Sequence, residues 1–160
     1  MKIIIEEFTE KDQEDLKEIF EEVWSQSYEY PEEWREKRKL TREEIIEEMR
    51  SGYHFFGVRN DKGKIMGVYK LIVTDEGCFG EHQSILPEYT KKGIASAMYE
   101  QFIDYAKSHK CKKNYVYILK THRACVHLVE KYGFRKVGEE FEQAEGMWVQ
   151  KYERLCDECG

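Results

Sequence analysis

The chain has 160 residues, of which 41% are hydrophobic and 36% charged, and its formal net charge is -6. This length and balance are typical of one globular domain with a well-solvated surface. The acidic charge argues against a broad nucleic-acid surface, which needs clustered Lys and Arg. No apolar run approaches the roughly 20 residues that cross a bilayer, and Glu6 follows the first apolar residues too soon for a signal peptide. We therefore expect a cytoplasmic protein with no nucleic-acid or membrane partner.

Five cysteines are scattered along the chain, and without a secretion signal they are expected to be free thiols. Cys156 and Cys159 have the spacing of half a zinc or redox site, but a single pair near a chain end does not complete one. We predict no metal site, and the sequence leaves the role of this pair open.

The first third of the chain reads as one strand followed by helices. Residues 2–8 carry three isoleucines in loose alternation and predict a strand. Thr9, with Asp12 three residues later, is typical of a helix start. The charged segment 31–50 is expected to be helical, with a capping box that begins at Thr41. The apolar residues of the first helix recur at helical spacing, at Leu16, Ile19, Phe20, Val23 and Trp24.

Three strands are expected next. His54–Val58 and Ile65–Val73 flank the segment 60–63, whose Asn, Asp and Gly favour a hairpin turn. A third strand runs from about Cys78 to Leu86 and ends at Pro87.

The last part of the chain alternates helices and strands. A helix is predicted over Gly93–Lys110, a short strand over Tyr115–Leu119 and a helix over Arg123–Tyr132, which Gly133 ends as a left-handed cap. The two final strands are expected at Phe134–Phe141 and Met147–Tyr152. The resulting order, β-α-α-β-β-β-α-β-α-β-β, predicts an α+β domain around one mixed sheet.

The segment 87–96 connects the third hairpin strand to the long helix. A strand that turns through small residues into a helix points unpaired backbone N–H groups at one place, and the helix dipole adds positive potential there. This suits a pyrophosphate, because Gly93 and Ala95 allow close approach while Lys91 and Lys92 add charge. An ordinary helix start with small packing residues would show the same local pattern, and the segment matches neither the dinucleotide fingerprint nor a P-loop.

Residues Thr90–Ala95 resemble the acetyl-CoA-binding motif Gln/Arg-x-x-Gly-x-Gly/Ala of the GCN5-related N-acetyltransferase (GNAT) superfamily. The segment from His122 to Phe134 resembles the family's Asn-x-x-Ala-x-x-x-Tyr helix, which is followed by Gly-Phe. The expected element order also matches the family fold. The resemblance implies a GNAT-like acyl-CoA N-acyltransferase fold over residues 1–155, with helices flanking a mixed central sheet, and a short C-terminal tail at 156–160.

This resemblance implies that acetyl-CoA lies between two splayed parallel strands, here the ones that end at Leu86 and Leu119. Backbone groups near Ile85 and Leu86 would pair with the pantetheine arm, and the amides of 91–96 would hold the pyrophosphate. The amine would attack directly, without an acyl-enzyme. The implied cofactor-binding residues are Ile85, Leu86, Thr90, Lys91, Lys92, Gly93, Ile94, Ala95, Ser96 and His122.

Several side chains depart from the family pattern. Thr90 stands where Gln or Arg is usual, His122 replaces the Asn that often contacts the cofactor arm, and Val129 replaces the tyrosine that acts as general acid. Tyr132 lies one turn further along the same face and is an alternative acid, although a packing role explains it better. Many family members function without an identified acid.

Glu81 is the candidate general base, because family bases often lie on this strand and act through water. Its neighbour His82 would point to the opposite face, and a solvated polar pair at a strand start is the alternative interpretation of both. A general base needs a pKa near neutral pH, and histidine has such a pKa intrinsically. His122 is a third option, although a polar contact with the cofactor fits it better.

For the acceptor, the aromatic residues Trp24, Tyr28 and Trp34, with Glu32 and Glu33, fall where the family builds its acceptor pocket. Packing of the first helices explains them equally well. The leading hypothesis is N-acetylation of a small-molecule primary amine. The alternatives are a peptide or protein N-acetyltransferase and a non-catalytic acetyl-CoA-binding module. Family members often pair as a homodimer, and no residue here identifies an interface.

Overall fold

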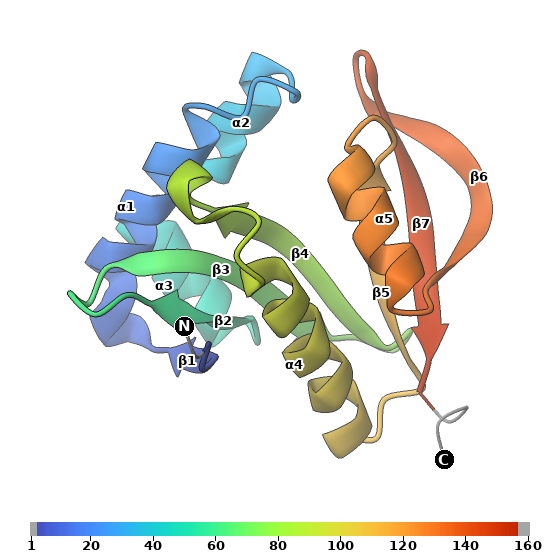
Figure 1. The fold of residues 1–160 in the computed structure, drawn as a ribbon, viewed down its shortest axis with the longest axis horizontal. Helices are drawn as coiled ribbons and strands as arrows, with labels where there is room; N and C mark the ends of the chain where they lie inside the picture. Colours follow the sequence, from blue (N-terminus) through green and yellow to red (C-terminus); the bar gives the residue numbers. More distant parts are fainter. Residues whose placement is uncertain (1–2, 157–160) are drawn as a thin grey trace.

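Residues 3–156, the part of the chain that the computed structural model describes, form one seven-stranded sheet. Its order is β1-β2-β3-β4-β5-β7-β6, and β4 and β5 are the one parallel pair (Figure 1). This mixed sheet confirms the predicted α+β fold. The strands are β1 (Glu6–Phe8), β2 (His54–Arg59), β3 (Ile65–Val73), β4 (Cys78–Ile85), β5 (Lys113–Leu119), β6 (Arg135–Ala144) and β7 (Met147–Leu155).

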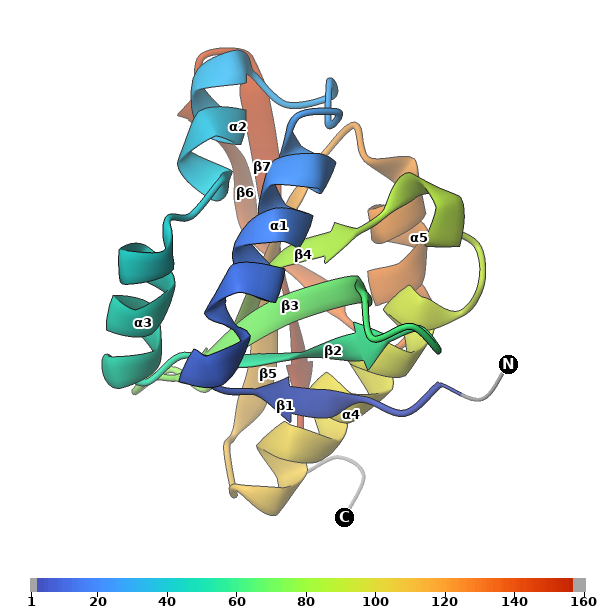
Figure 2. The same cartoon turned by 90° about the vertical axis from the view of Figure 1, so that its left-hand side faces the viewer.

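Helices cover both faces of the sheet. Figure 2 shows α1 and α3 on one side and α4 and α5 on the other. The sheet has a hydrophobic core on each side. Leu16, Ile19 and Phe20 of α1 are buried in one core, and Met98 and Phe102 of α4 are buried in the other. The helices are α1 (Gln13–Trp24), α2 (Glu32–Arg38), α3 (Arg42–Arg50), α4 (Ile94–Ser108) and α5 (Arg123–Lys131), with short 3₁₀ turns at Glu10–Asp12 and Pro87–Tyr89.

Local signals account for most element boundaries, with two differences. The expected helical segment 31–50 is two helices, because Thr41 and Glu44 form a reciprocal capping box that starts a new one. The strand predicted at residues 2–8 is confined to Glu6–Phe8 within the described residues. Gly133 has the predicted left-handed conformation, with φ at 85°, and ends α5.

Three further sequence expectations concern membrane spans, metal binding and the pair Cys156 and Cys159. None of the helices in the described part of the chain has the length and apolarity to span a bilayer. Across residues 3–156, no three His, Cys, Asp or Glu side chains are grouped as a metal site. Cys156 is buried, and Cys159 lies outside the described residues.

The parallel pair β4 and β5 separates after a short contact. Only Cys78 with Asn114 and Phe79 with Tyr115 are paired across it. On its other edge β4 carries a bulge, because Val68 pairs with Ser84 and Lys70 with Glu81, which leaves two residues opposite one on β3. Such a bulge bends its strand. The first of the two residues opposite Tyr69, His82, has a left-handed φ of 63°.

The bulge at His82 is held by α1 and by the end of α2. The Ser84 hydroxyl donates to the His82 carbonyl at 3.1 Å and accepts from Trp24 Nε1 at 2.8 Å. The imidazole stacks on Phe20 with 4.3 Å between ring centroids, and its Nε2–H donates to the Arg38 carbonyl at 2.9 Å. His82 is therefore a buried structural residue, and the expectation of a solvated polar pair with Glu81 is wrong for it.

We predict that His82 makes the protein less stable in acid. Burial first, and then the charges of Lys70 and Arg38, lower the pKa of His82 well below the usual 6.5. Below pH 6.5 the unfolded chain therefore binds a proton that the native state does not. The free energy of unfolding should fall by up to about 1.4 kcal/mol per pH unit from this residue.

Urea unfolding of wild type and His82→Asn between pH 6.5 and 5.5 measures this contribution. Asparagine tolerates the left-handed backbone and does not titrate, so the variant should show the shallower pH dependence. The exposed His127→Asn is the control and should keep the wild-type slope. Equal slopes for wild type and His82→Asn would contradict the prediction.

Candidate active site

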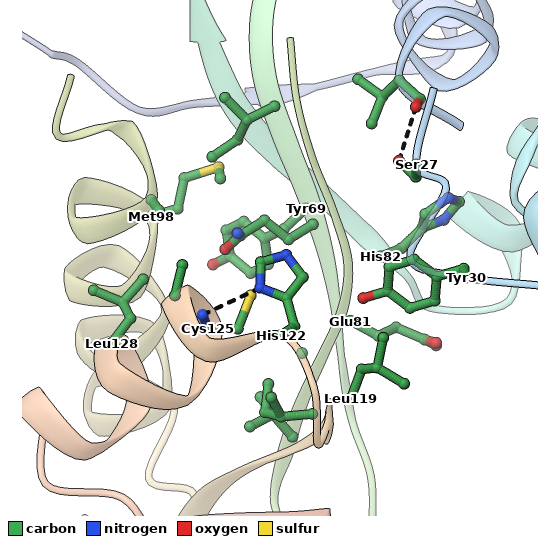
Figure 3. A pocket seen from close by; sticks show the side chains of 18 of the residues that line it. Ser27, Tyr30, Tyr69, Glu81, His82, Met98, Leu119, His122, Cys125 and Leu128 are labelled. Carbon is green, nitrogen blue, oxygen red and sulfur yellow. Dashed lines mark hydrogen bonds between the residues drawn. The ribbon is translucent and has the colours of Figure 1, made fainter. Parts of the chain in front are cut away.

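The separation of β4 from β5 opens a cavity of about 600 Å³. Its walls come from both halves of the sheet, from the turn before α4, from the N-terminal part of α5 and from the α1–α2 segment (Figure 3). Past Phe79 and Tyr115, the facing edges of the two strands have no hydrogen bond to each other. Backbone N–H and C=O groups in the middle of a sheet normally pair. The open edges therefore offer positions for an extended, amide-containing ligand.

Gly80 lies where the two strands begin to separate and also lines the cavity. A Cβ added there would lie 2.8 Å from the ring of Phe102 on α4. Glycine thus allows α4 to pack directly beneath the start of the cleft.

The turn before α4 presents a row of unpaired donors. The N–H groups of residues 91–96 have no hydrogen-bond partner among residues 3–156, and the first bond of the helix runs from Ala97 N to Gly93 O at 3.0 Å. Lys91 and Gly93 both have left-handed φ values, 61° and 87°. Alternating backbone conformations of this kind form anion-binding nests, and the α4 N-terminus adds its dipole.

The structure brings most of the predicted cofactor residues to this cavity. Those in its wall are Ile85, Thr90, Lys91, Gly93, Ile94, Ala95, Ser96 and His122. Lys92 is exposed and is not part of the wall. Leu86 is fully buried, its N–H donates to Met66 O at 3.0 Å, and its carbonyl accepts from Tyr89 N at 2.9 Å. Leu86 and the Lys92 side chain therefore lie outside the cavity wall, whereas the Lys92 N–H belongs to the row of unpaired donors.

Glu81, the candidate base, lies in the cavity wall with its carboxylate engaged. Oε2 accepts from the Tyr53 hydroxyl at 2.9 Å, and Oε1 is 3.3 Å from Arg38 Nη1. Figure 3 shows the carboxylate pointing away from His122. The side chain is 22% exposed, and the residue lines the cavity.

His122 caps α5 at the opposite wall. Its Nδ1 accepts from Cys125 N at 3.3 Å, and its Nε2 lies 3.8 Å from a Glu29 carboxylate oxygen. Val129 is fully buried in the core beside α4. Tyr132 stacks on Tyr99, donates its hydroxyl to Glu100 at 2.7 Å and does not line the cavity. The packing interpretation of Tyr132 therefore fits the structure, and its role as acid does not.

Residues that the sequence did not single out complete the wall, among them Tyr30, Arg38 and Tyr99. Tyr30 packs edge-on against Trp24, at 5.1 Å between ring centroids, and Figure 3 shows its hydroxyl directed into the cavity. Burial raises the pKa of Tyr30, so the hydroxyl stays protonated. Of the expected acceptor residues, Trp24 and Trp34 line the cavity, whereas Tyr28, Glu32 and Glu33 are exposed and do not.

Comparison with known families is consistent with this architecture. The acetyltransferase (GNAT) family profile matches residues 13–134, more than half of the chain. The chain belongs to the GNAT acetyltransferase family. It is therefore an N-acetyltransferase that uses acetyl-CoA.

Solved structures share the whole fold of this acetyltransferase at low sequence identity. PaiA N-acetyltransferase from Thermoplasma acidophilum, in complex with coenzyme A, is 22% identical with a TM-score of 0.78, covering 96% of this chain and 100% of the other. A chimera of spermidine N-acetyltransferase SpeG from Vibrio cholerae and hSSAT is 20% identical with a TM-score of 0.76, covering 99% and 98%. The ribosomal-protein-S18-alanine N-acetyltransferase from Escherichia coli is 13% identical with a TM-score of 0.77, covering 97% and 94%. A search of curated protein sequences found no match.

We predict that Gly93 is required for cofactor affinity. Gly93→Glu should abolish coenzyme A binding while the protein stays folded, because the side chain would add a negative charge to the N–H row. Gly93→Ala should weaken binding through backbone strain alone, since a Cβ there meets only Ile3 at 3.6 Å.

Gly63→Ala is the matched control, because Gly63 also has a left-handed φ, of 84°, but lies in the β2–β3 hairpin with no atom within 4 Å of an added Cβ. Both alanine variants should lose about 1 kcal/mol of stability. Calorimetry with coenzyme A should show unchanged affinity only for Gly63→Ala. Unchanged affinity for Gly93→Glu would refute the assignment of the turn.

Proposed function

We propose that the enzyme acetylates the primary amine of a small molecule by direct attack on acetyl-CoA. One observation carries this proposal: the α1–α2 segment closes over the acceptor side of the cleft. On one side of the split, Tyr30 and Trp34 pack against the core that contains α1. On the other side, they pack against the cluster of Leu119, Met147 and Val149. A segment that bridges the split leaves room for a small acceptor but obstructs a polypeptide.

In this proposal, the turn before α4 and the open strand edges bind the cofactor. The unpaired amides of 91–96, with Lys91, would hold the pyrophosphate. The free backbone edge of β4 up to Ile85 would pair with the amides of the pantetheine arm, and His122 would contact the arm from the opposite wall.

The chemistry follows from groups in the wall. Acetyl-CoA supplies an activated thioester. Glu81 would take, directly or through water, the proton that the acceptor's ammonium loses before nitrogen attacks the carbonyl carbon. Burial raises the pKa of the Cys125 thiol to about 12, so it offers no thiolate for an acyl-enzyme, which supports direct transfer.

Tyr30 is the proton donor that we propose in place of the family tyrosine. Val129 cannot donate a proton and is buried away from the cavity. The Tyr30 hydroxyl has no hydrogen-bond partner among residues 3–156 and points into the cavity. It would give its proton to the departing sulfur and regain one from water.

The solved structures with this fold include acetyltransferases of both a small polyamine and a ribosomal protein. A thiol-release assay over amines, polyamines, amino acids and peptides tests the acceptor class. We expect turnover with small amines or amino acids and little with peptides. Turnover confined to peptides would contradict the proposal, and tight coenzyme A binding without any turnover would favour the non-catalytic module.

We predict that Tyr30→Phe lowers kcat about 100-fold, the usual contribution of a general acid. Because the ring remains, the KM for acetyl-CoA should change less than about 2-fold. Tyr28→Phe on the same segment is the control, since Tyr28 is 75% exposed and does not line the cavity. Equal kcat values for Tyr30→Phe and wild type would exclude Tyr30 as the donor.

A further inference from the structure

The acceptor side of the cavity contains a fixed guanidinium. Among the described residues that line the cavity, Arg38 and Lys91 carry permanent positive charge. Lys91 belongs to the turn before α4, whereas Arg38 ends α2 and reaches Glu81 on β4. The charge of Arg38 is therefore placed beside the candidate base and is separate from the row of amides.

The position of Arg38 is determined by three contacts. Its carbonyl accepts the hydrogen bond from His82 Nε2, at 2.9 Å, which ties it to the bulge. Its guanidinium lies over the Trp34 ring, 4.4 Å from the centroid, and Nη1 donates to Glu81 at 3.3 Å. Holding the side chain in this way lowers the entropy cost of binding a ligand to it.

Most hydrogen-bonding capacity of this guanidinium is unused. Arginine has five N–H donors, and within residues 3–156 the side chain makes one hydrogen bond, to a single oxygen of Glu81. The side chain lines the cavity and is 17% exposed, so a ligand in the cavity can reach the remaining donors. A planar fork of this kind is suited to a carboxylate, which it can bind through two parallel hydrogen bonds.

Arg38 and Glu81 together complement a zwitterion. Glu81 can hold an ammonium group while Arg38 binds a carboxylate of the same molecule. A polyamine fits less well, because a second cationic amine would lie near the guanidinium. Resting on the proposed function, we infer that the acceptor is an amine that also carries a carboxylate, an amino acid in the broad sense, and that Arg38 is its anchor.

The test compares amino acids with the amines that differ only by loss of the carboxylate, for example phenylalanine with phenethylamine and lysine with cadaverine. In the thiol-release assay, kcat/KM should be about 100-fold higher for the amino acid of a pair, because a site built for a polar group rejects the analogue that lacks it. Most of the difference should lie in KM.

Arg38→Met should bring the ratio of kcat/KM within each pair close to one by raising the KM of the amino acid. Lys37→Met is the control. Lys37 is an exposed cation on the same helix, and it does not line the cavity. This variant should keep the wild-type ratio.

A second measurement needs only the wild-type enzyme, in case Arg38→Met fails to fold. N-acetyl amino acids should inhibit as products at lower concentrations than the N-acetyl amines of the same pairs. Equal kcat/KM within the pairs would overturn the inference while leaving the proposed function intact. Faster turnover of a phosphorylated amine such as phosphoethanolamine would overturn the carboxylate assignment. No turnover of any amine or amino acid, despite coenzyme A binding, would overturn both.

Discussion

The left-handed backbone of His82 in the middle of β4 is the constraint on which the active site depends. A non-glycine residue in this conformation is strained, and it is held by the Ser84 hydroxyl, by the Arg38 carbonyl and by stacking on Phe20. The resulting bulge lies on the β3 edge of β4, in the part of the strand that is no longer paired with β5. Stability and function are linked here, because two of the groups that hold the bulge, Phe20 and the Arg38 carbonyl, belong to the helices of the proposed acceptor wall.

Opening a sheet in its centre leaves backbone groups without partners, which a domain tolerates where a ligand uses them. The cleft of this acetyltransferase combines two such features. The facing edges of β4 and β5 suit amides, and the row of N–H groups before α4 suits phosphates. An acyl-CoA carries both kinds of group along one chain, so its chemistry matches the order of the features along the cavity. The acceptor side differs, since it depends on charged side chains and on the packing of Tyr30 and Trp34.

Much of the fold could be predicted from local sequence patterns, because helix faces, capping boxes and the hairpin turn are encoded within a few residues. The small residues of the segment Thr90–Ala95 likewise predicted the turn with unpaired N–H groups that precedes α4. The bulge could not be predicted, because contacts of His82 with Phe20 and Arg38 span more than forty positions. The places of Tyr30 and Arg38 in the cavity wall could not be predicted either, because they too depend on contacts between residues far apart in the sequence. Leu86 is expected to bind the cofactor from its place in the chain, but its backbone N–H and carbonyl are hydrogen-bonded to Met66 and Tyr89.

Amide hydrogen exchange with and without coenzyme A tests the central claim most directly, which is that the split between β4 and β5 is the cofactor site. The account predicts that coenzyme A slows exchange at the amides of 91–96 and along β4 from Gly80 to Ile85. Amides of β1 and β2, which have ordinary sheet partners, should change little. Protection that spares both the turn and β4 would contradict the account.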